Sequence, residues 1–255
     1  MQLSFNPAWM VAFMFATIRC GAWLSIAPPF QGAVPAKIRA GLSMALGLAM
    51  TPRLMASGKM PSNETWGLLV GALHQAVIGL ALGFLVFVLF QAVAAAGGMI
   101  DAFAALTSAQ LFDPFSKTSA GPVSRLYQTL GTAVLFVTNG HLMLIAGLSR
   151  TFDLAPVSGF RMDRLGSLLI HDVLTFLTAA LQIAAPILGA LFVTEILLGL
   201  ASRAAPKLNI MVLGFGAKSL VMFMLLGAAI PLVPYVTAQL VKNSLSVMRL
   251  LVKGG

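Results

Sequence analysis

The chain has 255 residues, of which 59% are hydrophobic and only 9% are charged, whereas soluble domains carry about 25% charged residues. This composition excludes a soluble fold of this size. The continuous apolar runs exclude a β-barrel, whose strands alternate apolar and polar residues. We therefore predict an all-α, polytopic membrane protein, because helices satisfy their own backbone hydrogen bonds in lipid. The net charge of +9 is scattered between apolar runs, which favours contact with lipid headgroups over nucleic-acid binding.

Hydrophobic segments separated by short polar connectors make up most of the chain. We predict six segments: Pro7–Ile26, Ala40–Met50 with its flanks, Leu68–Ile100, Leu126–Leu148, Val173–Leu200 and Ile210–Leu240. We predict the connectors at Pro28–Arg39, Thr51–Glu64, Asp101–Arg125, Arg150–Asp172 and Ser202–Asn209. Lys and Arg are slightly more frequent on the side of the two termini, which weakly favours cytoplasmic termini.

The first segment contains a single charged residue, Arg19. Its long side chain either snorkels to a membrane interface or pairs with a carboxylate, because an unpaired charge inside a membrane is costly. The carboxylate would belong to another subunit or, within this chain, to Asp101 or Glu195.

The third segment is too long for one membrane crossing. Thr65–Ile100 contains no acidic or basic residue, and a helix of that length reaches about 54 Å, beyond the roughly 30 Å hydrocarbon core. We expect either a break near Gly97-Gly98 or a helix that leaves the membrane while packed on protein. The pairs Gly67/Gly71 and Gly79/Gly83 have the Gly-x-x-x-Gly spacing that lets helices approach closely.

The connector Ala102–Pro122 is apolar and aromatic, yet Asp113-Pro114 and Gly121-Pro122 interrupt it. Backbone groups of such a segment cannot be left facing lipid. We expect it to pack inside protein or to line a pore; the alternative is a loop folded onto its own helices.

Asn139-Gly140-His141 interrupts the fourth segment, and the fifth contains Glu195, the only carboxylate deep within an apolar run. A buried carboxylate of this kind usually has a partner or a function. Arg203 and Lys218 are the candidate partners, and a charge pair that holds the helices together is favoured over a proton relay.

Between the fifth and sixth segments lies a compact connector, Arg203–Lys218. Pro206 ends the preceding helix, and Asn209 is suited to cap the next one. Downstream, the spacing of Lys242, Ser246, Arg249 and Lys253 puts one polar stripe on a terminal helix at Leu240–Lys253. That helix would lie at the membrane interface or dock a cytoplasmic partner.

Catalytic and metal-binding patterns are missing from the sequence. No His-Glu-x-x-His, phosphate-binding loop or Gly-x-Ser-x-Gly motif occurs. The three histidines lack a second ligand at helical spacing, and Cys20 is the only cysteine. We therefore predict a protein that is not an enzyme and has no metal and no cofactor.

Several motifs occur in a fixed order along most of the chain. They are Arg19 with Pro28-Pro29, Pro35 and Arg39; Gly98-Met99-Ile100-Asp101 with Asp113-Pro114; Asn139-Gly140-His141 with Ser149, Phe152 and Pro156; and Ala185-Pro186, Gly199, Arg203, Pro206, Leu208-Asn209, Gly214 and Lys218. This ordered set resembles the FliR/SctT family, the membrane subunits of the flagellar and injectisome type III export gate. His74-Gln75 departs from the family pattern, in which an acidic residue is expected before Gly79.

The resemblance implies a subunit of a helical export gate for unfolded flagellar substrates in the bacterial inner membrane and flagellar basal body. Residues 1–172 would be similar to a FliP-like protein, and residues 173–255 to a FliQ-like hairpin with an amphipathic C-terminal helix. FliP-like, FliQ-like, FlhB-like and FlhA-like proteins would be the partners.

The resemblance also assigns roles to residues of this chain. The central loop would plug the closed pore through Leu106, Leu111, Phe112, Asp113, Pro114 and Phe115. Assembly would depend on Arg19, Pro28, Pro29 and Arg39 near the N-terminus and on Glu195, Arg203, Pro206, Lys207, Asn209 and Lys218 in the late hairpin. The alternatives are an injectisome subunit and a stand-alone secondary transporter with a site at the membrane midplane.

Overall fold

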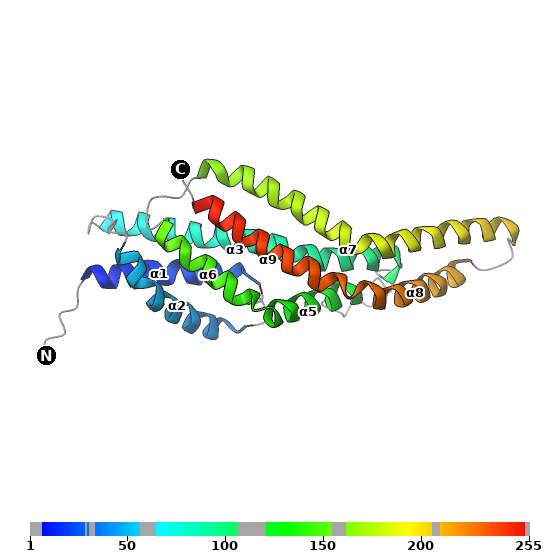
Figure 1. Cartoon of the computed structure of the whole chain (residues 1–255), viewed down its shortest axis with the longest axis horizontal. Helices are drawn as coiled ribbons and strands as arrows, with labels where there is room; N and C mark the ends of the chain where they lie inside the picture. Colours follow the sequence, from blue (N-terminus) through cyan, green and yellow to red (C-terminus); the bar gives the residue numbers. More distant parts are fainter. Residues whose placement is uncertain are drawn as a thin grey trace. The chain divides into compact units, whose positions relative to one another are not determined.

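A computed structural model describes residues 7–28, 30, 34–56, 65–106, 121–154, 162–205 and 210–252, and its regular elements within these ranges are α-helices (Figure 1). The helices are α1 (Pro7–Ile26), α2 (Ala36–Ala56), α3 (Thr65–Phe103), α5 (Pro122–Val137), α6 (Gly140–Leu154), α7 (Met162–Ala204), α8 (Ile210–Ala229) and α9 (Leu232–Val252). The all-α prediction is confirmed.

The number of helices suited to cross a membrane is smaller than the six predicted segments. Within the described ranges α1, α3, α7 and α8 are long and apolar enough, and α5 with α6 would add a fifth as one broken span. Neither α2 nor α9 is among them. Positively charged residues occur in the sequences of both helices, at Lys37, Arg39 and Arg53 in α2 and at Lys242 and Arg249 in α9.

The chain forms two compact units that do not follow chain order. The first unit comprises Met1–Leu89, Asn139–Val173 and Leu240–Gly255, and the second comprises Phe90–Thr138 and Leu174–Gln239. The predicted division between residues 172 and 173, with its similarity to two different subunits, stays a prediction.

In the first unit, α1 packs along α2 and against the first half of α3, through glycines. A side chain at Gly79 would overlap the backbone oxygen of Arg19, and one at Gly83 would lie 3.0 Å from the backbone oxygen of Trp23. The prediction that Gly79 and Gly83 mark a close helix contact is confirmed, and the partner helix is α1 of the same chain. Phe15, Trp23, Ile78, Leu82 and Phe152 are among the fully buried side chains of this unit.

In the second unit, α7 and α8 form an antiparallel hairpin (Figure 1). A side chain at Gly214 of α8 would contact Leu198 of α7. Many large apolar side chains of this hairpin remain exposed in the single chain, as expected where lipid or other subunits cover a surface. They include Leu177, Leu181, Phe192, Leu197, Val212, Phe223 and Met224.

Of the two alternatives for the third segment, the break near Gly97-Gly98 is wrong, because α3 continues for 39 residues to Phe103. Gly97 serves close packing instead. A Cβ atom there would lie 2.5 Å from Cα of Ser124, so only glycine lets the start of α5 approach α3 this closely.

Other helix ends also differ from the prediction. α6 extends to Leu154 and α7 begins at Met162, so most of the connector predicted at Arg150–Asp172 is helical. The sixth segment is broken at Ile230-Pro231 into α8 and α9, because a proline ring has no N–H for the helical ladder and clashes with the preceding turn. The predicted interruption of the fourth segment is confirmed, with Asn139 in a left-handed conformation at a φ of 55°.

Candidate functional site

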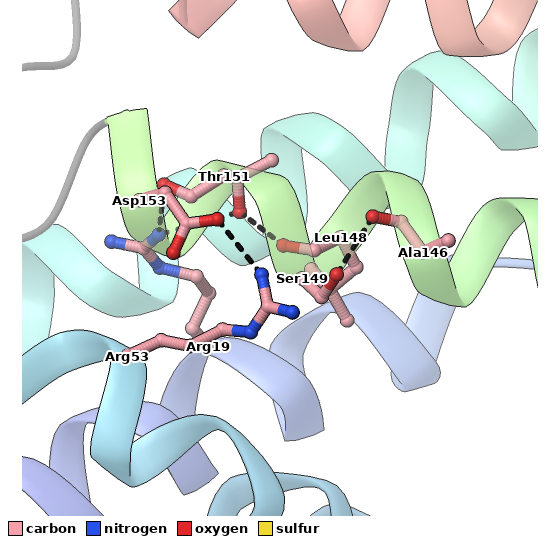
Figure 2. Close-up of polar contacts among 7 residues, drawn as sticks. All are labelled: Arg19, Arg53, Ala146, Leu148, Ser149, Thr151 and Asp153. Atoms are coloured by element: carbon pink, nitrogen blue, oxygen red, sulfur yellow. Dashed lines mark hydrogen bonds and ion pairs between the residues drawn. The ribbon is translucent and has the colours of Figure 1, made fainter.

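Arg19 of α1 is fully buried in the first unit, where α3 and α6 supply partners for its side chain. Its Nε donates to Oε1 of Gln75 on α3 over 2.6 Å, and its Nη1 donates to the backbone oxygen of Thr151 on α6 over 3.0 Å. The guanidinium also stacks over the ring of Phe152, 4.4 Å from its centroid. Figure 2 shows Arg19 reaching from α1 to the last turn of α6.

These contacts explain how an arginine is tolerated in an apolar environment. Hydrogen bonds from a charged donor are about twice as strong as neutral ones, and a desolvated cation–π contact contributes about 2 kcal/mol. Of the two alternatives weighed for Arg19, snorkelling to an interface is wrong within this chain, because the side chain is fully buried. The glycine contact also helps to form the cluster, because Gln75 precedes Gly79 by one helical turn and both lie on the face of α3 that meets α1.

A second arginine binds the same turn of α6. Nη1 of Arg53, from α2, lies 2.8 Å from Oδ2 of Asp153, and both side chains are half-exposed (48% and 46%). Figure 2 shows this pair beside Arg19 and Thr151. The end of α6 is thus held by two arginines. The buried Arg19 contacts Thr151 and Phe152, and the half-exposed Arg53 contacts Asp153.

In the second unit, Asp101 caps the start of α5. The backbone N–H of Val123 donates to Oδ1 over 3.0 Å, and that of Ser124 donates to Oδ2 over 2.9 Å. The hydroxyl of Ser124 also donates to the backbone oxygen of Ala94 on α3, over 2.9 Å. Asp101 was a candidate partner of Arg19, but its carboxylate is occupied by these two backbone donors.

Glu195 of α7 forms an ion pair with Lys218 of α8. The Glu195 side chain is 61% exposed and that of Lys218 is 18% exposed. The glutamate is therefore the more accessible member of the ion pair. Of the two partners weighed from sequence, Lys218 is confirmed. Arg203 lies exposed at the end of α7.

The other residues singled out from sequence are placed as follows. Pro28 lies in the turn after α1, Arg39 lies in the first turn of α2, and Leu106 is the last described residue before the central loop. Outside the described residues lie Pro29, Leu111, Phe112, Asp113, Pro114, Phe115, Pro206, Lys207 and Asn209. Sequence reasoning did not select Thr151 or Asp153, and it noted Gln75 only as a departure from a pattern; hydrogen-bond partners far apart in the chain leave no local signal.

The described ranges contain no group of three or more His, Cys, Asp and Glu side chains that could hold a metal ion. The clusters found instead contain one cation with neutral acceptors, one carboxylate with backbone donors, and two ion pairs. These contacts join neighbouring helices, and the contact of Asp101 holds the end of α3 beside the start of α5.

Comparison with known proteins gives one consistent result. Residues 10–244 match the family described as bacterial export proteins, family 1. The flagellar biosynthetic protein FliR of Escherichia coli (strain K12) is 32% identical over 229 residues, covering 89% of this chain and 87% of that protein. FliR of Bacillus subtilis (strain 168) is 25% identical, covering 93% of both chains. Yop proteins translocation protein T of Yersinia pestis is 29% identical, covering 74% of this chain and 73% of that protein.

Proposed function

Because the chain belongs to family 1 of the bacterial export proteins, we propose that it is a membrane subunit of the flagellar type III export gate. The observation that carries this proposal is the FliR relative at 32% identity, which aligns with nearly the whole length of both chains. Yop proteins translocation protein T of Yersinia pestis aligns over a smaller share of this chain, 74%. This difference favours the flagellar system over an injectisome.

The subunit acts by assembly and conduction, without bond chemistry. It sits in the bacterial inner membrane at the flagellar basal body, with FliP-like and FliQ-like subunits around it and FlhB-like and FlhA-like components nearby. The exposed apolar side chains of the α7–α8 hairpin support this arrangement, because such surfaces need lipid or another subunit to cover them. Unfolded flagellar proteins are the cargo.

The central loop closes the pore in the resting gate. This part of the proposal rests on the apolar, turn-rich sequence from Leu106 to Phe115. Leu111, Phe112 and Phe115 form the seal, and export requires the loop to withdraw. The energy comes from other components of the export apparatus, such as an export ATPase and the proton motive force.

The decisive experiment co-expresses this chain with its genomic neighbours and measures the purified assembly by native mass spectrometry. The expected result is a discrete hetero-oligomer with one copy of this chain and several copies of small membrane proteins. A monomer or homodimer would contradict the export-gate proposal and favour a transporter.

The plug is tested by replacing residues 107–120 with a short Gly/Ser linker. The replacement is feasible because Asp101 at the end of α3 bonds directly to the start of α5, so a short linker spans the two ends. We expect the assembled complex to leak ions across a planar bilayer. Unchanged conductance with a normal yield of complex would contradict the plug. Complementation of a motility-deficient strain separates the flagellar from the injectisome role.

A further inference from the structure

We propose that Asp172 of α7 is a proton-binding site, held as a neutral carboxylic acid inside the first unit. The proposal concerns a group to which the proposed function gives no role, and it stands whether or not the chain assembles into an export gate. It rests on the burial of the side chain, on its contacts and on its place along α7.

The Asp172 side chain is 1% exposed. Both of its carboxyl oxygens are buried, and within the part of the chain that the structure describes neither accepts a hydrogen bond. An ionised carboxylate taken out of water without donors is very costly, and such a group becomes neutral instead. The surroundings of Asp172 therefore favour the acid over the carboxylate.

The other acidic side chains that the structure describes are in a different situation. Asp101 is equally buried, but its two oxygens accept backbone N–H groups. Asp153 and Glu195 are partly exposed, and each forms an ion pair with a basic side chain. Bonds of this kind stabilise a negative charge. Among the described carboxyl groups, Asp172 differs in lacking such a donor.

The helix that carries Asp172 does not replace the missing donors. The free N–H groups and the positive end of a helix dipole lie in the first turn. α7 begins at Met162, ten positions before Asp172, so this side chain lies beyond that turn. Its own helix therefore does not stabilise it as an anion.

A histidine connects this buried group to the surface. Nδ1 of His171 lies 3.9 Å from Oδ1 of Asp172, and the histidine side chain is 67% exposed. Among the described residues, His171 is the titratable group that acts on the carboxyl. An imidazole gains and loses a proton near neutral pH, and one bridging water spans a separation of this size. His171 thus gives a proton a route between the solution and Asp172.

Release of the proton would change the packing of α7 in the first unit. The carboxylate left behind would be a buried charge without donors, so either water must enter or the helix must shift to expose the group. Binding of a proton at Asp172 is therefore coupled to the packed conformation of this part of α7.

The test records infrared spectra of the complete chain, purified with its co-expressed partners, at neutral pH. The C=O stretch of a neutral carboxylic acid is separate from the absorption of carboxylates. We expect an acid band in the parent that is lost in Asp172→Asn. Asp101→Asn is the matched control, because it removes an equally buried carboxyl group, and it should keep the band. His171→Gln should also keep it.

Thermal unfolding gives a second readout. At neutral pH, Asp172→Asn should raise the unfolding midpoint, because the folded parent must hold a proton that its unfolded chain releases. This gain should disappear towards a pH of about 4, where an exposed aspartate also binds a proton. Asp101→Asn should instead lower the midpoint, because it removes an acceptor from a buried N–H group.

Three results would overturn the inference. The first is an acid band that is the same in the parent and in Asp172→Asn. The second is failure of Asp172→Asn to assemble where Asp101→Asn assembles, because an amide has the shape of the neutral acid and its failure would show that a charge is required. The third is loss of the band in His171→Gln, which would show that the imidazole, and not burial, keeps the carboxyl neutral. These readouts do not depend on a pore or on export, so they also leave the proposed function to its own test.

Discussion

The Nε of Arg19 donates to Oε1 of Gln75 over 2.6 Å, so a buried cation on α1 is held by a neutral side chain on α3. Family resemblance predicts an acidic residue in this region of α3, before Gly79. In this chain the α3 side chain in the contact is neutral. Further contacts, with the backbone oxygen and the hydroxyl of Thr151 and with the ring of Phe152, come from α6.

We predict that Gln75→Glu stabilises the chain and that Gln75→Ala destabilises it. A carboxylate would form an ion pair with the Arg19 guanidinium, whose present bond to Gln75 has only one charged partner. Truncation to Ala takes away an acceptor from a buried donor, at a cost of about 1–3 kcal/mol. The measurement is the thermal unfolding midpoint of the complex in detergent at pH 8. Gln128→Ala, at an exposed glutamine of α5, is the control and should have little effect; equal effects at the two positions would contradict the role of Gln75.

The close contact between α1 and α3 predicts opposite effects for two glycine substitutions. Gly79→Ala forces a methyl group against the backbone oxygen of Arg19 and should destabilise the chain by about 1–3 kcal/mol through overpacking. Gly41→Ala, in α2, meets open space and should stabilise by up to about 1 kcal/mol, because alanine favours helix more than glycine does. Complex yield and thermal unfolding report both. If Gly79→Ala changes neither the yield of complex nor its thermal unfolding, α1 and α3 lie further apart than the structure places them.

The pair formed by Glu195 and Lys218 predicts that charge exchange rescues charge removal. Lys218→Ala leaves the Glu195 carboxylate without its partner in an apolar hairpin, which is costly, and should lower the yield of assembled complex. The double variant Glu195→Lys with Lys218→Glu preserves the pair and should restore much of that yield. Gln128→Ala, at an exposed glutamine of α5, is the comparison. If the double variant gives as little assembled complex as either single reversal, each of the two charges has a different partner in the assembly.

Burial predicts very different costs for the two arginines that bind the end of α6. Arg53 and Asp153 are half-exposed, so Arg53→Ala should cost less than about 1 kcal/mol. That cost should vanish at 1 M salt, where screening acts within about 3 Å. Arg19→Ala should cost more than Arg53→Ala at any salt concentration, because it leaves the acceptors of a buried cluster without their donor, at about 1–3 kcal/mol for each. Thermal unfolding at low and high salt separates the two cases, and a salt-sensitive Arg19→Ala would show that water reaches the cluster.

Local sequence features predicted many of the elements but not all of their ends. The first segment, Pro7–Ile26, coincides with α1, since an apolar run that begins with proline and ends before Pro28-Pro29 has unambiguous limits. The break at Ile230-Pro231 was also encoded locally, yet the apolar residues on both sides concealed it. Gly97-Gly98 resembled a break, but close packing on α5 requires glycine at position 97 and the backbone stays helical.

By itself the sequence determined the class of the protein and its family. Those depend on composition, on continuous apolar runs and on motifs in a fixed order, all of which are properties of the chain read in one dimension. Only the tertiary structure decided which side chains meet. Arg19 is separated from Thr151 by 132 positions and from Gln75 by 56, and Asp101 is separated from Val123 by 22. The physical reason is that a buried polar group takes whichever partner the helix packing brings within hydrogen-bond distance, and glycines at the helix contacts set that packing.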